Sequence, residues 1–82
     1  MNKNKILERI GIDPNLMDGK PVIKGTRLTV EYILGLLTQG TTFDEVMEEY
    51  SGITTEDIQA CLLFAIKSLE ITEFMPLTIK AS

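Results

Sequence analysis

The chain offers few side chains that could catalyse a reaction. It contains no histidine, which excludes Ser-His-Asp and Cys-His catalysis and any zinc site that needs imidazole. Cys61 is the single cysteine, so no disulfide can form within the chain. Its place among apolar residues predicts a small core side chain rather than a reactive thiol. We therefore expect a protein that is not an enzyme, with no catalytic residues and no cofactor.

Four acidic side chains crowd one short segment: Asp44, Glu45, Glu48 and Glu49. Carboxylates in such numbers can hold Mg²⁺ or Ca²⁺. The segment lacks the spacing of a calcium loop, and acids on a helix surface are usually solvated. We interpret the cluster as a hydrated helix surface and expect no metal site.

Charge is distributed unevenly along the chain, whose total is −4. Residues 1–30 carry six basic and three acidic side chains, which gives a net charge of +3. Residues 31–82 carry two basic and nine acidic side chains, which gives −7. This asymmetry is typical of proteins that contact a polyanion, although two solvated ends would also produce it. Lys20, Lys24 and Arg27 are our candidates for contacts with nucleic acid, and Arg27 has the alternative of pairing with an acid of the helices.

The first 28 residues have the pattern of short strands and turns. Asp13-Pro14-Asn15 interrupts the apolar residues, and Asp18-Gly19 follows shortly afterwards. An Asp-Gly pair accommodates the positive φ angles of a type I′ turn, so we expect a β-hairpin that turns there. Pro21 would restrict the following strand to a sheet edge or a strand start. Gly25 is expected to allow a second bend.

Three helices are expected over residues 29–70, because each begins with a capping signal. Thr29 would cap the first helix, which ends at Gly40. Residues 42–45 (TFDE) form a capping box for the second, which ends at Ser51-Gly52, and residues 54–57 (TTED) cap the third, which ends near Glu70. Apolar residues follow each start at helical spacing.

The third helix has more apolar residues than a core needs. Its expected core face comprises Ile58, Cys61, Leu62, Ala65 and Leu69. Leu63, Phe64 and Ile66 widen that face, which makes them candidates for binding a partner.

The second and third helices are joined by about four residues that include Gly52, which is the arrangement of a helix-turn-helix unit. In a homeodomain-type module the last helix enters the major groove of DNA. Gln59 suits base readout there, whereas Glu56 and Asp57 would meet the phosphates with the wrong sign. Gln59 therefore joins Lys20, Lys24 and Arg27 as a candidate nucleic-acid contact.

Beyond Glu70, apolar and polar residues alternate, which predicts an extended tail over residues 71–82, and Pro76 excludes a central strand. The sequence thus predicts a mainly α fold in a single domain: a strand and β-hairpin segment (1–28), a three-helix bundle (29–70) and the tail (71–82). A chain this short has a marginal core, so we expect a homodimer. No apolar run approaches the roughly 18 residues of a membrane span, and none follows Met1–Lys5, so we expect a cytoplasmic protein without membrane contact.

The order of these motifs resembles one bacterial family. Asp13-Pro14-Asn15, the run GKPVIKGTRLTV (residues 19–30) and the helices that close with residues 54–58 are similar to the family known as domain of unknown function 433, over roughly residues 6–69. The resemblance implies a homeodomain-like three-helix bundle preceded by a β-hairpin. Members look like antitoxins of type II toxin-antitoxin pairs, often encoded beside a small PIN-like ribonuclease toxin.

The resemblance therefore implies that the chain binds and silences such a nuclease and represses the shared promoter. PIN-like nucleases hold metal ions in a pocket of carboxylates, which Arg27 or Lys80 could enter. Side chains of the tail would pack on the toxin by strand addition: Phe74, Met75, Leu77 and Ile79. Two alternatives stay open, a DNA-binding regulator without a toxin partner and a homodimeric adaptor with Leu63, Phe64, Ile66 and the tail as its interface. The tail could also pair with the chain's own hairpin or with a second copy.

Overall fold

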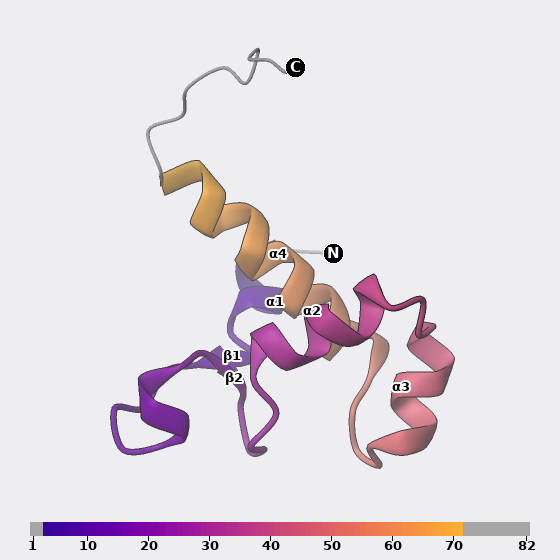
Figure 1. The fold of residues 1–82 in the computed structure, drawn as a ribbon. Coiled ribbons are helices and arrows are strands. Elements are labelled where there is room, and N and C mark those ends of the chain that lie inside the picture. Colours follow the sequence, from indigo (N-terminus) through magenta and orange to yellow (C-terminus); the bar gives the residue numbers. More distant parts are fainter. Residues whose placement is uncertain (1–2, 72–82) are drawn as a thin grey trace.

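The computed structural model describes residues 3–71 (Figure 1). Within them lie four α-helices: α1 (Lys3–Leu7), α2 (Val30–Thr38), α3 (Phe43–Glu49) and α4 (Thr55–Ile71). Two short strands, β1 (Ile10–Gly11) and β2 (Val22–Ile23), pair antiparallel, with Ile10 opposite Ile23 and Gly11 opposite Val22. The predicted mainly helical fold with an N-terminal hairpin is confirmed. The helix-rich body occupies one end of the view, and the second half of α4 projects from it.

The predicted extended tail lies almost wholly outside the described residues. The candidate partner-binding residues of that tail therefore also lie outside them: Phe74, Met75, Leu77, Ile79 and Lys80. Ile71, which was assigned to that tail, is the last residue of α4. The third helix therefore runs one residue beyond its predicted end at Glu70.

The hairpin forms, but its turn differs from the prediction. Residues 12–21 connect the two strands, with a 3₁₀ turn at Met17–Gly19, in place of a tight turn at Asp18-Gly19. Asp18 and Gly19 do adopt positive φ angles, 59° and 78°. Asp13 adds a turn of its own, because its carboxylate accepts the Asn15 N–H at 2.9 Å. Two successive turns lengthen the connection.

Helix α1 was missed, since residues near the N-terminus were assigned to strands and turns. A helix of five residues is too short to show a periodic pattern of apolar side chains in the sequence. Such a short helix is stable only when it packs against the rest of the protein. Ile6 and Leu7 of α1 are half-buried, and α1 packs against α4.

The predicted helix boundaries agree with the observed caps. Thr29 Oγ1 accepts the Tyr32 N–H at 3.0 Å, and the capping box between Thr42 and Glu45 is complete. Helix α2 ends in a Schellman motif, in which Gly40 has a φ of 94° and the N–H of Thr41 donates to the carbonyl of Leu36 at 3.1 Å. Residues 50–54 form the short turn between α3 and α4.

The core draws on β2 and on helices α2, α3 and α4. Its buried members are Ile23, Val30, Ile33, Val46, Ile53, Ile58 and Cys61. Cys61 is fully buried, and burial raises the pKa of its thiol to about 12, so it is a core residue as predicted. Leu62 and Leu69 were wrongly assigned to the core, because they are 38% and 68% exposed while Ala60 is fully buried.

An ion pair joins the segment between α1 and β1 to the first turn of α4. Arg9, between α1 and β1, donates from Nη1 to Oδ1 of Asp57 at 3.1 Å. The other carboxylate oxygen accepts the Thr54 N–H at 3.0 Å, while Thr54 Oγ1 accepts the Asp57 N–H at 3.2 Å, so Asp57 also completes the cap of α4. The Arg9 carbonyl in turn accepts the Lys24 N–H at 2.8 Å, just after β2. These bonds connect the segment that contains Arg9, the start of α4 and the backbone just after β2.

Substituting Asp57→Ala should lower the free energy of unfolding by about 2–3 kcal/mol, because it removes a helix cap and leaves Arg9 without its partner. Chemical denaturation of both proteins measures the difference. Glu56→Ala is the matched control and should cost less than about 1 kcal/mol, since Glu56 makes no comparable bond and only favours the helix dipole. Equal stabilities for the two variants would contradict this assignment.

Candidate functional site

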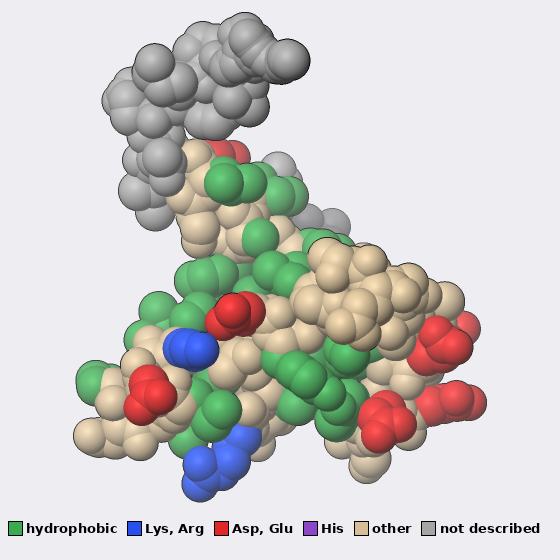
Figure 2. All heavy atoms as spheres, in the orientation of Figure 1, with side chains coloured by type: hydrophobic (Ala, Val, Ile, Leu, Met, Phe, Trp, Pro, Cys, Tyr) green, Lys and Arg blue, Asp and Glu red, His purple; other side chains and the backbone are tan. Residues whose placement is uncertain are grey.

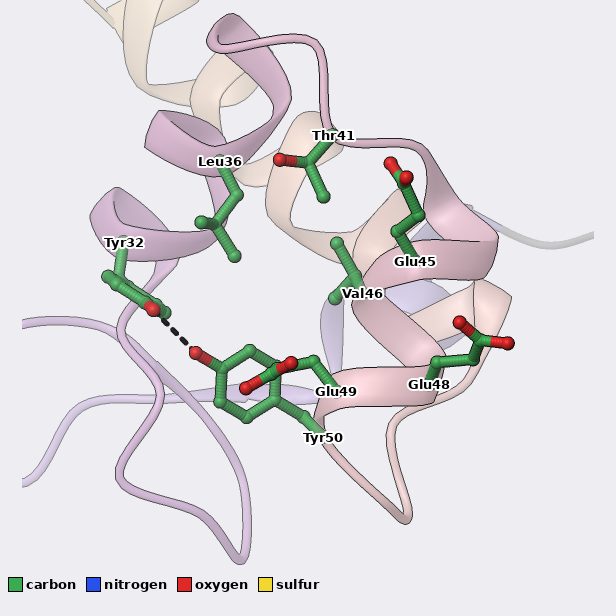
Figure 3. Close-up of a pocket in the computed structure, with 8 residues that line it drawn as sticks. All are labelled: Tyr32, Leu36, Thr41, Glu45, Val46, Glu48, Glu49 and Tyr50. Atoms are coloured by element: carbon green, nitrogen blue, oxygen red, sulfur yellow. Dashed lines mark hydrogen bonds between the residues drawn. The ribbon is translucent and has the colours of Figure 1, made fainter.

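Two tyrosines from different elements meet on the surface (Figure 3). The hydroxyls of Tyr32, on α2, and Tyr50, just after α3, are hydrogen-bonded at 2.5 Å. Their rings are 6.0 Å apart and nearly perpendicular. Tyr32 remains 45% exposed. We refer to Tyr32 and Tyr50 as the tyrosine pair.

Tyr50 holds its proton tightly. The hydrogen bond to Tyr32, with lesser effects of desolvation and of the charges on Tyr32 and Glu49, raises the pKa of Tyr50 to about 12. Tyr50 is therefore neutral at physiological pH, and its hydroxyl lies beside that of Tyr32 on an aromatic surface.

An acidic depression of about 810 Å³ lies on one side of the tyrosine pair. Glu45, Glu48 and Glu49 of α3 line it, and Figure 3 shows their carboxylates around its rim. Glu45 is engaged in the capping box, whereas Glu48 and Glu49 form no ion pair within residues 3–71. All four acids of the predicted cluster are exposed, and the described part of the chain holds no group of His, Cys, Asp or Glu placed to bind a metal ion.

A basic depression of about 400 Å³ lies on the other side and shares both tyrosines. Lys20 and Arg27 line it together with Met17 and Asp18. Lys20 forms an exposed ion pair with Glu31 at 3.4 Å. Arg27 is exposed and has no ion pair or side-chain hydrogen bond in the part of the chain that the structure describes, so the alternative pairing with an acid of the helices is not seen there.

The turn between β2 and α2 presents Arg27. Thr26 Oγ1 donates to the Ile23 carbonyl at 2.7 Å and accepts the Leu28 N–H at 3.0 Å, which closes the loop tightly. Gly25 allows the bend with a φ of 80°, as predicted. Arg27 thus projects from an ordered turn.

The structure brings together only two of the four candidate nucleic-acid contacts. Lys20 and Arg27 share the basic depression, whereas Lys24 does not line it. The stem of Lys24 lies over Gly11, where an added Cβ would come within 3.1 Å of Lys24 Cγ. Gln59 is exposed on α4.

The sequence analysis did not single out the tyrosines as site residues. Tyr50 was assigned to the apolar stripe of the second helix. Tyr32 falls between the stripe positions Val30 and Ile33, which was the signal that it would be exposed.

A second surface lies along the projecting half of α4. Leu62, Ile66 and Leu69 follow i, i+4, i+7 spacing and are 38%, 51% and 68% exposed. We call these three residues the α4 stripe. Hydrophobic side chains are visible along this part of α4 in Figure 2.

The predicted partner-binding residues of the third helix, which is α4, therefore differ in their exposure to solvent. Ile66 is exposed, and Leu63 is half-buried. Phe64 packs against the core and lines a shallow apolar groove of about 290 Å³ with Pro21, Val30 and Leu34. None of the helices within residues 3–71 has the length and apolar character to span a bilayer.

Comparison with known proteins identifies relatives of this fold. Residues 10–65 match a family model described as "Protein of unknown function (DUF433)". The crystal structure of a DUF433 member protein from Anabaena variabilis ATCC 29413 is similar, with 26% sequence identity and a TM-score of 0.73 over 83% of this chain and 67% of that chain. No curated protein matches the sequence. The matched residues include the tyrosine pair and both depressions, and end before Ile66.

Substituting Tyr32→Phe should lower the pKa of Tyr50 from about 12 towards its ordinary value of 10, because the largest cause of the upward shift is removed. The chain has only two tyrosines, so tyrosinate absorbance in this variant reports Tyr50 alone. Circular dichroism during the same titration restricts the measurement to folded protein. A Tyr50 that ionises at the same pH in both proteins would disprove the assigned cause.

Proposed function

The chain belongs to the DUF433 family, and we propose that it is a non-catalytic, antitoxin-like protein that binds and silences a PIN-like ribonuclease encoded beside it. The α4 stripe is the observation that carries this proposal. Single exposed hydrophobic residues are ordinary on a monomer, but three on one helix face form the pattern by which helices dock in grooves.

The stripe also has a suitable position. Exposure rises from Leu62 to Leu69 as α4 leaves the body, so a partner can cover the stripe without displacing the core. Burial of apolar surface contributes about 25 cal/mol per Å² removed from water, which makes this face the natural source of affinity.

The sequence after α4 extends the proposed contact. Phe74, Met75, Leu77 and Ile79 supply further apolar side chains that could add to the partner as a strand. For the cation that enters the carboxylate pocket of the nuclease we favour Lys80, which follows them. The connection between β2 and α2 that carries Arg27 lies at the opposite end of the view from the last turn of α4, whereas Lys80 follows α4 in the sequence (Figure 1).

Substituting Ile66→Glu or Leu69→Glu should weaken nuclease binding at least about tenfold, because a carboxylate would have to be buried in an apolar contact. The partner is the purified product of the neighbouring reading frame, and the readouts are affinity and inhibition of its RNA cleavage. Ile12→Glu is the matched control, since Ile12 is 61% exposed and lies in the hairpin connection, outside the α4 stripe. It should bind like the unmodified chain.

Deletion of residues 71–82 gives an independent result. It should abolish nuclease binding while the helical circular dichroism of the remainder persists. Unchanged inhibition by the deletion variant, or by both stripe variants, would end the proposal.

Repression of the shared promoter is the second candidate function. Asp57, which was expected to repel phosphates, is buried and paired with Arg9, while Gln59, two residues further along α4, stays exposed. This pairing removes one of the two acids that oppose a DNA contact at the start of α4.

Binding to duplex DNA from the promoter should weaken steeply with salt if phosphates are contacted. Lys24→Ala should reduce the slope of log affinity against log salt by about one. Gln59→Ala should instead reduce the preference for the promoter over unrelated DNA. Affinity that does not change with salt would exclude this second function.

A further inference from the structure

One face of the molecule carries opposite charges on either side of the tyrosine pair. Figure 2 shows acidic side chains gathered over α3 and, towards the hairpin, basic side chains with acidic ones beside them; hydrophobic surface lies between the two regions. We define the bipolar face as Lys20 and Arg27 on one side, Tyr32 and Tyr50 in the centre, and Glu48 and Glu49 on the other.

We propose that the bipolar face binds a second copy of the chain about a two-fold axis through the tyrosine pair, with Arg27 of each copy against Glu48 and Glu49 of the other. A two-fold axis in the plane of an interface exchanges the two ends of each face. The basic half of one copy therefore meets the acidic half of its partner, and the same contact forms twice.

The charges that make this contact are unused within the described chain. Arg27, Glu48 and Glu49 have no ion-pair partner in residues 3–71, whereas Lys20 and Glu45 are already engaged. The guanidinium group forms forked hydrogen bonds to carboxylates, which gain strength when an interface excludes water. Asp18 lines the basic depression and leaves it a net charge of +1, against −3 for the acidic depression. Arg27 is thus the cation that the pairing depends on.

The centre of the face is suited to burial. Met17 is 39% and Tyr32 45% exposed, and Leu28 and Leu36 line the two depressions. Tyrosines contribute large contact areas at low entropic cost and are enriched where binding energy concentrates. The face spans the hairpin connection, α2 and the end of α3, in a chain whose size alone gives a marginal core.

The α4 stripe lies outside the bipolar face. The dimer proposal therefore rests on other residues than the stripe, and it holds whether or not a nuclease partner exists.

The proposed pairing is tested by substitutions that reverse single charges in the full chain. Analytical sedimentation at low ionic strength measures whether each protein is a monomer or a dimer. The unmodified chain should be a dimer that dissociates as salt rises. Arg27→Glu and Glu49→Arg should each weaken dimerisation at least about tenfold. Arg27→Glu places like charges opposite one another, and Glu49→Arg replaces an attraction to Arg27 by a repulsion. An equimolar mixture of the two variants should dimerise again, since both ends of a mixed pair are complementary.

Two substitutions control for charge alone. Lys24→Glu and Asp44→Arg make the same charge changes at exposed residues that line neither depression, and both should stay dimeric. Three results would each overturn the proposal: a monomeric unmodified chain, single variants that dimerise normally, or a mixture that stays monomeric. Loss of the dimer in Ile66→Glu but not in Arg27→Glu would assign the interface to the α4 stripe instead.

Discussion

The carboxylate of Asp57 is where the N-terminal segment is tied to the helices. One oxygen caps α4 and the other holds Arg9, whose carbonyl fixes the backbone just after β2. The short hairpin has only two residues in each strand and would not hold this position by itself. The turn that carries Arg27 and the start of α2 follow β2 directly, so this carboxylate supports the placement of the basic depression together with the burial of Ile23 in the core.

Helix starts could be predicted from the sequence, whereas contacts between residues far apart in the chain could not. The starts of α2, α3 and α4 were predictable because the cap residues Thr29, Thr42 and Thr54 act on backbone groups within three residues. The bond between Arg9 and Asp57 spans 48 positions, and nothing near either residue announces it. The same holds for the tyrosine pair, which joins residues 18 positions apart, and for α1, which needs α4 to be stable.

The molecule separates two kinds of surface. The bipolar face relies on charge, with aromatic rings in its centre, and its elements lie within the residues that match the DUF433 family. The α4 stripe relies on apolar area, and two of its three residues lie beyond the matched range. Electrostatic contacts favour orientation and fast association, whereas apolar contacts supply affinity. Under the two proposals, this small chain assembles with itself and holds a different partner through separate surfaces.

Helix α4 has two unlike halves in one continuous rod. Its first turns supply Ile58, Ala60 and Cys61, which fit a closely packed interior and tolerate little change of shape. Its last turns face solvent, where substitutions usually alter stability by less than about 0.5 kcal/mol. The end of this rod can therefore vary in sequence at little cost to folding.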